Sequence, residues 1–401
     1  MEAGQYGKCR IDASLCGRYS RTKKSFSPKF FDCRLGATYG SGCRANALKQ
    51  KGSGTTIVTQ EKTTAATPVP LMQLATGFWA FKALAGAQEL GLFTHLSREG
   101  GITILEAARK FQINERPAEL LLTACASLGL LEKDGGKYRN SALSEEFLVK
   151  GKPYYFGGFV QMLDRRLYPG WGKLSEALRT NRPTTWDPER QKSLFEGEDP
   201  EMLATFWEAM HSLSTFTARE LGAAIDFRDY SRLLDVGGGS GAFEIELCRR
   251  YPNLRATVYD LPAVTEIAAA NIAEAGMSER IATASGDFWV DPKFPAGHDV
   301  MLFSMIMHDW TEAKDRTLLA KAYRGLPSRG AIVICELLVN DEKTGPPPAA
   351  LMSLNMLIET EGRNYTSAEY TNWLAEAGFI DIRTIWFNAA GANGAVVGRK
   401  P

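Results

Sequence analysis

The chain has 401 residues, of which 44% are hydrophobic and 23% are charged, and its formal net charge is +1. This length is sufficient for two domains with a large core, and the near-zero net charge excludes nucleic-acid binding through a broadly basic surface. The sequence contains no apolar run long enough to cross a bilayer and no signal-peptide core after Met1. We therefore expect a cytoplasmic protein with neither a membrane nor a nucleic-acid partner.

Residues 1–70 differ in composition from the rest of the chain. They hold 12 Lys and Arg against 4 Asp and Glu, show no sustained periodicity, and end in the Pro-containing stretch Thr63–Pro70. Such a segment cannot bury enough apolar surface to offset its ordering entropy, so we expect a disordered, dispensable basic extension. Its four cysteines contain no C-x-x-C spacing, and no metal site is expected there or elsewhere. The other three cysteines lie in apolar segments and are expected to be reduced core thiols.

Residues 71–170 are expected to form a helical domain that carries a hairpin. Helical periodicity runs from Met72 to a stop near Gly91, and two short helices follow at Ile104–Ala108 and Pro117–Leu122. Gly129–Tyr138 is typical of a hairpin with a glycine turn. This order is that of a winged helix, but the second and third helices are acidic or apolar rather than basic. We therefore interpret the domain as a protein–protein, dimerising winged helix.

Residues 171–401 begin with an aromatic helical stretch and then alternate strands with helices. Alternation of this kind predicts an α/β fold with a Rossmann-like, mostly parallel sheet covered on both faces. Ligands of such sheets bind at the carboxyl ends of the strands. The expected strands are Arg232–Val236, Arg255–Tyr259, Ile281–Ser285, Val300–Ser304, Ala331–Leu337, and a later pair near Ile382–Phe387 and Ala395–Arg399.

A glycine-rich turn after the first of these strands predicts a nucleoside-cofactor site. Asp235–Gly241 reads Asp-Val-Gly-Gly-Gly-Ser-Gly, and the next strand ends at Asp260, whose carboxylate can accept both hydroxyls of a ribose. The turn also satisfies the dinucleotide pattern, so NAD stays open on this feature alone. Clustered carboxylates at the strand ends would repel a pyrophosphate and favour S-adenosylmethionine. The candidate cofactor residues are Asp235, Gly237, Gly239, Gly241, Asp260, Leu261, Gly286, Asp287, Phe288 and Ser304.

The candidate catalytic base is His308, which follows the fourth strand on the same sheet edge. A neutral imidazole can take the proton of a hydroxyl as that hydroxyl becomes a nucleophile. Glu336 ends the fifth strand, where its carboxylate could hold the other imidazole nitrogen. The chain has no G-x-S-x-G elbow, no Walker loop and no H-E-x-x-H motif that would compete with this pair.

Four motifs in this order make the chain resemble the class I S-adenosylmethionine-dependent O-methyltransferases, especially the plant caffeate and acetylserotonin type and its bacterial antibiotic-pathway relatives. The motifs are the glycine turn, Val-Tyr-Asp-Leu-Pro ending at Pro262, Gly-Asp-Phe ending at Phe288, and His-Asp-Trp ending at Trp310. The likeness covers roughly residues 72–400. It implies a homodimer through the N-terminal helices, in which a partner segment helps to close each pocket. It also implies that Gly237 and Asp260 contact the cofactor, that Asp287 and Phe288 lie near its adenine, and that His308 and Glu336 are the base and its orienting acid.

Two positions depart from this family pattern. Plant members carry Lys four residues before the histidine, where this chain has Ser304. They also carry a second glutamate in a Gly-Gly-x-Glu-Arg-Thr stretch, which is matched here by Glu361–Thr366 with Asn364 at the glutamate position. Asparagine can orient an imidazole but supplies no negative charge.

The sequence therefore predicts O-methylation of a hydroxyl on a small aromatic or polyketide-like molecule, with His308, Glu336 and Asn364 as the catalytic set. The alternatives are C- or N-methylation, decarboxylation or hydroxylation by a cofactor-binding relative, and a non-enzymatic, ligand-sensing winged-helix regulator. The residues expected to line the acceptor site are Met162, Trp207, Met210, His211, Asn355 and Met356.

Overall fold

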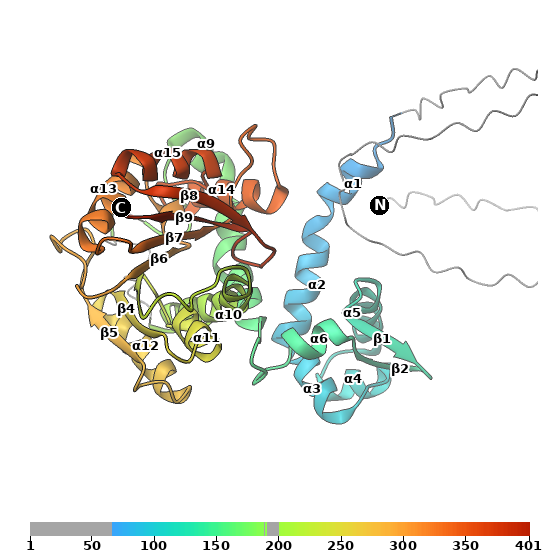
Figure 1. The fold of residues 1–401 in the computed structure, drawn as a ribbon. Coiled ribbons are helices and arrows are strands. Elements are labelled where there is room, and N and C mark those ends of the chain that lie inside the picture. The colour runs from blue at the N-terminus through green and yellow to red at the C-terminus, as the bar shows by residue number, and fades with distance from the viewer. Residues whose placement is uncertain (1–65, 188, 191–199) are drawn as a thin grey trace, which may run out of the picture. The chain divides into compact units, whose positions relative to one another are not determined.

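The structure is a computed structural model that describes residues 66–187, 189–190 and 200–401 (Figure 1). Residues Thr67–Pro401 form one compact unit. The expected disorder and dispensability of residues 1–70 concern a segment that lies outside the described residues, apart from its last five. The expected domain boundary at residues 170 and 171 stays a prediction.

The N-terminal helices precede the hairpin as expected, but the structure adds a helix at Leu92–Glu99 that the sequence did not indicate. An antiparallel hairpin pairs Leu131 with Asn140, and Ile102 adds one bridge to Tyr138. The helices pack around a separate apolar core that includes Phe93 and Leu122, both fully buried. The elements are α1 (Val69–Ala75), α2 (Gly77–Glu89), α3 (Leu92–Glu99), α4 (Ile104–Lys110), α5 (Glu115–Ser127), β1 (Leu131–Asp134), β2 (Lys137–Asn140) and α6 (Ala142–Phe147).

A run of helices connects this part to the sheet. The chain stays helical from Gly157 to Trp171, with a π-helical turn in the middle. The helix α10 then packs against both α7 and α11. These elements are α7 (Gly157–Met162), η1 (Leu163–Leu167), α8 (Tyr168–Trp171), α9 (Leu174–Thr180) and α10 (Pro200–Ala224).

The C-terminal part contains a seven-stranded sheet in the order β5-β4-β3-β6-β7-β9-β8. The first five strands in that order are parallel, and β9 pairs antiparallel with both β7 and β8. The expectation of a mostly parallel sheet is therefore confirmed. The strands are β3 (Arg232–Val236), β4 (Arg255–Asp260), β5 (Ile281–Ser285), β6 (Val300–Ser304), β7 (Ala331–Glu336), β8 (Ile380–Trp386) and β9 (Gly394–Arg399).

Both faces of the sheet are buried at its central strands, because successive residues of these strands enter two different cores. Leu233 packs in a core with α10, α11 and α12, whereas the next residue, Leu234, packs in a core with α13 and α15. Figure 1 shows these two sets of helices on opposite sides of the strands. The helices are α11 (Ala242–Arg250), α12 (Pro262–Glu274), η2 (Met307–Asp309), α13 (Glu312–Gly325), α14 (Pro347–Glu359) and α15 (Ser367–Ala377).

Three further expectations can be compared with the described residues. Cys125, Cys248 and Cys335 are buried free thiols, as expected. Among the residues that the structure describes, no helix is long and apolar enough to cross a membrane. The same residues contain no cluster of three or more His, Cys, Asp or Glu side chains with a metal-binding arrangement.

Candidate active site

A cavity of about 880 Å³ opens at the carboxyl ends of the parallel strands. Its wall includes the glycine turn after β3, Asp260 after β4, and His308 after β6. Side chains of α7, α8, α10 and α14 complete the wall with aromatic rings and methionines. The cavity therefore joins a polar, loop-built region and an apolar, helix-built region in one space.

The glycine turn is built from backbone conformations that side chains rarely adopt. Gly237 and Gly239 have φ angles of +73° and +57°. A Cβ atom on Gly237 would lie 2.4 Å from Ile306, and one on Gly239 would lie 3.1 Å from Trp207. Glycine is therefore required for both the fold of the turn and the close approach of a ligand to its backbone. Gly241 (φ +79°) is the N-cap of α11 and does not border the cavity, so its role in this structure is to start the helix.

Asp260 is held in place by two backbone amides. Its Oδ2 accepts a hydrogen bond from the amide of Gly239 at 2.9 Å, and its Oδ1 accepts one from Leu261 at 2.7 Å. Burial raises the pKa of Asp260 to about 6, although both hydrogen bonds act in the opposite direction. The carboxylate thus has a fixed position in the cavity wall, as a ribose-binding acid requires.

The remaining expected cofactor residues lie in the same wall. Asp287 accepts a hydrogen bond from the amide of Trp289 at 2.7 Å, and Phe288 packs edge-on against Trp289 and Trp310. Asp235, Leu261, Gly286 and Ser304 also border the cavity. Nine of the ten candidate cofactor residues are thereby brought together, Gly241 being the exception.

Asp235 has a buried partner that the sequence did not indicate. Its carboxyl group interacts electrostatically with that of Glu244 on α11, and both residues are at most 1% exposed. Burial and then the neighbouring Glu244 raise the pKa of Asp235 well above its usual range, and burial raises that of Glu244 to about 7. Two carboxyl groups in contact without a cation share a proton. Beneath the glycine turn the structure therefore holds an acid pair rather than two free carboxylates.

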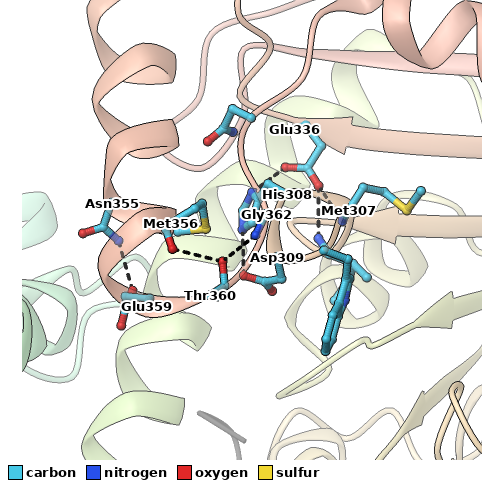
Figure 2. A network of polar contacts seen from close by, with 12 residues as sticks. Met307, His308, Asp309, Glu336, Asn355, Met356, Glu359, Thr360 and Gly362 are labelled. Atoms are coloured by element: carbon cyan, nitrogen blue, oxygen red, sulfur yellow. Dashed lines mark hydrogen bonds and ion pairs between the residues drawn. The ribbon is translucent and has the colours of Figure 1, made fainter. Parts of the chain in front are cut away.

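His308 and Glu336 form the ion pair predicted from their strand ends (Figure 2). The Nδ1 atom of His308 lies 2.7 Å from Oε2 of Glu336. The other oxygen of Glu336 accepts hydrogen bonds from the backbone amides of Ile306 and Met307, each at 3.1 Å. Glu336 is therefore fixed by the backbone that precedes the histidine, and it fixes the imidazole in turn.

The surroundings make His308 an unusually strong proton acceptor. Burial alone would lower the pKa of its imidazole, but the charges of Glu336 and then Asp309 outweigh burial and raise it to about 9. The Asp309 Oδ1 atom lies 3.7 Å from Nε2, and burial raises the pKa of Asp309 to about 7. A phenol has a pKa of about 10, so proton transfer from a phenolic hydroxyl to His308 is nearly balanced in free energy.

Asn364 lies outside the cavity wall. Its side-chain amide donates a hydrogen bond to the carbonyl of Leu337 at 2.8 Å, and its backbone amide donates to Ser353. No contact between Asn364 and His308 is seen within the described part of the chain. The side chain therefore secures the loop after β7 rather than orienting the imidazole.

Five of the six candidate acceptor residues border the cavity: Met162, Trp207, Met210, Asn355 and Met356. The exception is His211, whose Nδ1 lies 2.9 Å from the hydroxyl of Ser240. This contact supports the glycine turn from behind, because α10 directs His211 toward α11 and Trp207 toward the cavity.

Sequence reasoning missed several cavity residues. The most informative is Glu359, the last residue of α14, which borders the cavity and forms an ion pair with Arg166 at 3.4 Å. An acid at the end of an apolar helix gives no sequence signal that separates a buried wall position from a solvated helix end. Phe159, Tyr168, Trp171 and Phe206 come from the aromatic helical stretch in which sequence reasoning left core and pocket wall open, and they line the cavity. Phe81, Trp289 and Trp310 also line the cavity and were not expected there.

Comparison with known proteins places this geometry in a family. The chain matches an O-methyltransferase domain over residues 171–380 and an O-methyltransferase dimerisation domain over residues 72–150. It is 51% identical over 334 residues to 3-hydroxy-5-methyl-1-naphthoate 3-O-methyltransferase of Streptomyces sahachiroi, covering 83% of this chain and 95% of that protein. It is 34% identical to the tetracenomycin polyketide synthesis 8-O-methyl transferase of Streptomyces glaucescens, covering 83% and 97%. The crystal structure of human N-acetylserotonin methyltransferase in complex with S-adenosylmethionine superimposes with a TM-score of 0.74 at 30% identity, covering 84% of this chain and 99% of that chain.

Proposed function

The chain belongs to the S-adenosylmethionine-dependent O-methyltransferase family, and we propose that it methylates a phenolic hydroxyl on a fused-ring aromatic of polyketide type. The observation that carries this proposal is the ion pair of His308 with Glu336, which shares one cavity with the glycine turn and the apolar wall. A base, a cofactor turn and a flat apolar surface are the three parts that methylation of an aromatic hydroxyl needs.

The residues present fit S-adenosylmethionine. The backbone of Gly237 and Gly239 borders the cavity without a side chain, because a Cβ at either position would crowd Ile306 or Trp207, and Asp260 presents a fixed carboxylate beside Gly239. Asp287 and Phe288 supply a polar edge and an aromatic face for the adenine. The acidic strand ends suit a ligand with a sulfonium and an ammonium and disfavour a pyrophosphate, so NAD fits this wall poorly. When bound, the cofactor supplies an electrophilic methyl group.

The acceptor class is supported by the apolar wall and by the relatives. Methionines and aromatic rings from four helices favour a flat, apolar molecule, and about 880 Å³ leaves room for a cofactor together with two or three fused rings. By their names, the two bacterial relatives act in 3-O-methylation of a hydroxynaphthoate and in 8-O-methyl transfer during tetracenomycin polyketide synthesis. We therefore place this chain's acceptor among such aromatics.

The protein's own chemical contribution is to accept one proton and to hold the acceptor oxygen in line with the methyl group. His308 takes the hydroxyl proton while Glu336 stabilises the resulting imidazolium. General base catalysis of this kind contributes about two to four powers of ten, and positioning contributes the rest.

We also propose that two copies associate through the N-terminal helices, which would form the winged-helix-like dimerisation domain. The support is an apolar surface on α1 and α2, where Leu71, Leu74 and Trp79 are each more than 60% exposed. Several large apolar side chains exposed on two consecutive short helices are typical of a surface that another chain covers. The three buried, free thiols favour a reducing compartment, for which we propose the cytoplasm. The near-neutral charge supports the absence of a nucleic-acid partner.

The test of the proposed function is a methyl-transfer assay with a panel of naphthols and larger polyketide-type phenols, read by the mass gain of one methyl group. His308→Ala should still bind S-adenosylmethionine in calorimetry, while turnover falls by about two to four powers of ten. Unchanged turnover of His308→Ala would remove the base assignment. Binding of NAD in place of S-adenosylmethionine would contradict the cofactor assignment.

A further inference from the structure

The glycine turn between β3 and α11 has one side chain by which the rest of the protein can hold it. Residues 237–241 read Gly-Gly-Gly-Ser-Gly, so Ser240 is the only residue of the turn that carries a Cβ atom. Ser240 borders the cavity and is 3% exposed. Glycine loses more conformational freedom on folding than any other residue, so a turn of this composition needs contacts that keep it in one conformation.

Two helices that are distant from the turn in sequence contact Ser240. From α10, the Nδ1 atom of His211 lies 2.9 Å from the hydroxyl oxygen of Ser240. From α12, the side-chain amide of Asn271 donates a hydrogen bond to the backbone carbonyl of Ser240 at 3.0 Å. The same amide nitrogen lies 3.4 Å from Nδ1 of His211, so the three residues form one network. Both the side chain and the main chain of Ser240 are therefore held.

The contacts of Asn271 determine which nitrogen of His211 carries the proton. A backbone carbonyl can only accept, so the atom of Asn271 that faces it must be the amide nitrogen, which can only donate. The Nδ1 atom of His211 beside that nitrogen must then be an acceptor without a proton. Burial lowers the pKa of His211, which keeps the imidazole neutral at pH 7 with its proton on Nε2. The hydroxyl of Ser240 therefore donates to Nδ1.

The helix α10 contacts the turn in a second place. A Cβ atom on Gly239 would lie 3.1 Å from the ring of Trp207, which borders the cavity. Trp207 and His211 are four residues apart and therefore neighbours on the surface of α10. One helix thus contacts two consecutive residues of the turn, Gly239 through a ring and Ser240 through a hydrogen bond. The conformation of the turn depends on α10 as well as on β3 and α11.

We propose that His211 is a positioning residue for S-adenosylmethionine and that it acts through Ser240. As a neutral acceptor, its Nδ1 atom holds the hydroxyl of Ser240 and keeps the glycine turn in the conformation that receives the cofactor. His211 itself does not border the cavity, so it touches neither the cofactor nor the reacting atoms. The inference rests on the cofactor and not on the identity of the methyl acceptor, so binding alone can test it.

The test measures by calorimetry the affinity of the full chain for S-adenosylmethionine and for S-adenosylhomocysteine. His211→Leu and Ser240→Ala each remove one side of the bond, and each should weaken both ligands by about three- to tenfold, as expected for one neutral hydrogen bond. The double variant should bind no more weakly than the single ones, because both substitutions remove the same contact. His211→Asn should keep nearly the wild-type affinity, since its side-chain oxygen can accept at the place of Nδ1. In the methyl-transfer assay, His211→Leu should raise the KM for S-adenosylmethionine more than it changes kcat.

The matched control is His298→Leu, because Nε2 of this half-buried histidine lies 2.9 Å from the hydroxyl of Thr257 and neither residue borders the cavity. The control should leave both affinities unchanged, and an equal loss there would assign the effect to general destabilisation and overturn the proposal. Unequal losses for the two ligands in His211→Leu would also overturn it, because they would point to charge rather than to the shape of the turn.

If His211→Leu fails to fold, the smaller substitutions decide. Unchanged affinity in Ser240→Ala, or a loss in His211→Asn as large as that in Ser240→Ala, would contradict the proposal. Nitrogen NMR of the wild-type protein should show Nδ1 of His211 without a proton, and a proton on Nδ1 would remove the hydrogen bond on which the inference depends. Failure of the wild-type protein to bind either ligand would instead overturn the cofactor assignment, and this inference with it.

Discussion

Replacing Glu336 with glutamine should change the pH dependence of turnover in a direction that the structure fixes. The substitution preserves the volume of the side chain and one oxygen, so the imidazole of His308 keeps a hydrogen-bond acceptor at Nδ1. It removes the negative charge that lies 2.7 Å from that nitrogen. The perturbation therefore separates the electrostatic role of Glu336 from its role in orientation.

The magnitude follows from the pKa of His308. A value of about 9 against the usual 6.5 corresponds to about 3 kcal/mol of preferential stabilisation of the imidazolium. In the wild-type protein only about one imidazole in a hundred is neutral at pH 7, so kcat/KM should rise with pH up to about 9. Without Glu336, burial is the dominant influence and the charge of Asp309 opposes it. In Glu336→Gln, the pH below which kcat/KM declines should therefore move to below about pH 7. The plateau value of kcat/KM at high pH should fall by about a hundredfold, because the imidazolium has lost the carboxylate that stabilises it.

The assay is the pH profile of kcat/KM from about pH 6 to about pH 10, compared among the wild-type protein, Glu336→Gln and the surface control Glu312→Gln. A raised folded-state pKa contributes stability that is fully present below about pH 6.5 and is lost as the pH rises through about 9. The difference in free energy of unfolding between wild type and Glu336→Gln should therefore shrink over that window. The reasoning is refuted if the wild-type acid limb already lies near pH 6, or if Glu336→Gln leaves it in place.

Three further predictions concern the cofactor, the assembly and the N-terminal segment. Asp260→Asn should weaken S-adenosylmethionine binding in calorimetry by about 1.5–3 kcal/mol. Because the pKa of Asp260 is about 6, wild-type affinity should fall below that pH while the variant stays flat. Leu74→Glu combined with Trp79→Glu should give a monomer in sedimentation, since both side chains belong to the exposed apolar surface of α1 and α2; a dimer that persists would place the interface elsewhere. A chain starting at Thr67 should keep the melting temperature and turnover of the full chain, and loss of either would assign a structural role to the segment before it.

The central strands could be predicted from the sequence because they are buried on both faces. Arg232–Val236 and Val300–Ser304 have the bounds that their apolar runs predict, since such runs change to polar or glycine residues at the point where burial ends. Ile281–Ser285 also has the expected bounds, although it is an edge strand in which only Ile281 is buried. The first helix was less predictable. Periodicity indicated one helix from Met72 to Gly91, whereas the structure has α1 and α2 with a break at Thr76. Apolar residues recur at helical spacing on both sides of Thr76, so their periodicity alone gives no signal for the break.

The sequence predicted which residues lie at the ends of the strands in the active site. It did not predict in which direction the side chains of nearby residues point. His308 and Glu336 meet because parallel strands β6 and β7 end at the same edge, which sequence order alone implies. His211 and Gly241 lie near that edge but do not border the cavity: His211 contacts Ser240 in the glycine turn, and Gly241 caps α11. The periodicity of the sequence does not distinguish a residue that faces the cavity from one that faces away from it. A residue's distance from a motif along the chain predicts its neighbourhood, whereas its contacts depend on how helices from another part of the chain pack against the sheet.

Asn364 and Glu359 show that the sequence also did not predict which polar side chains lie in the cavity wall. The family pattern directs attention to Asn364, where a glutamate is missing, but its amide is engaged by the carbonyl of Leu337 away from the cavity. Five residues earlier, Glu359 places a carboxylate in the cavity wall, and its charge is felt by His308. In the sequence, a glutamate is missing at position 364, and Glu359 has no pattern that distinguishes it from a solvated acid. Only the fold shows that Glu359 borders the cavity and pairs with Arg166. Glu336 contacts the imidazole and sets the strength of the base, whereas Glu359 lies in the helix-built part of the wall and acts on His308 through its charge, so the two carboxylates are not interchangeable.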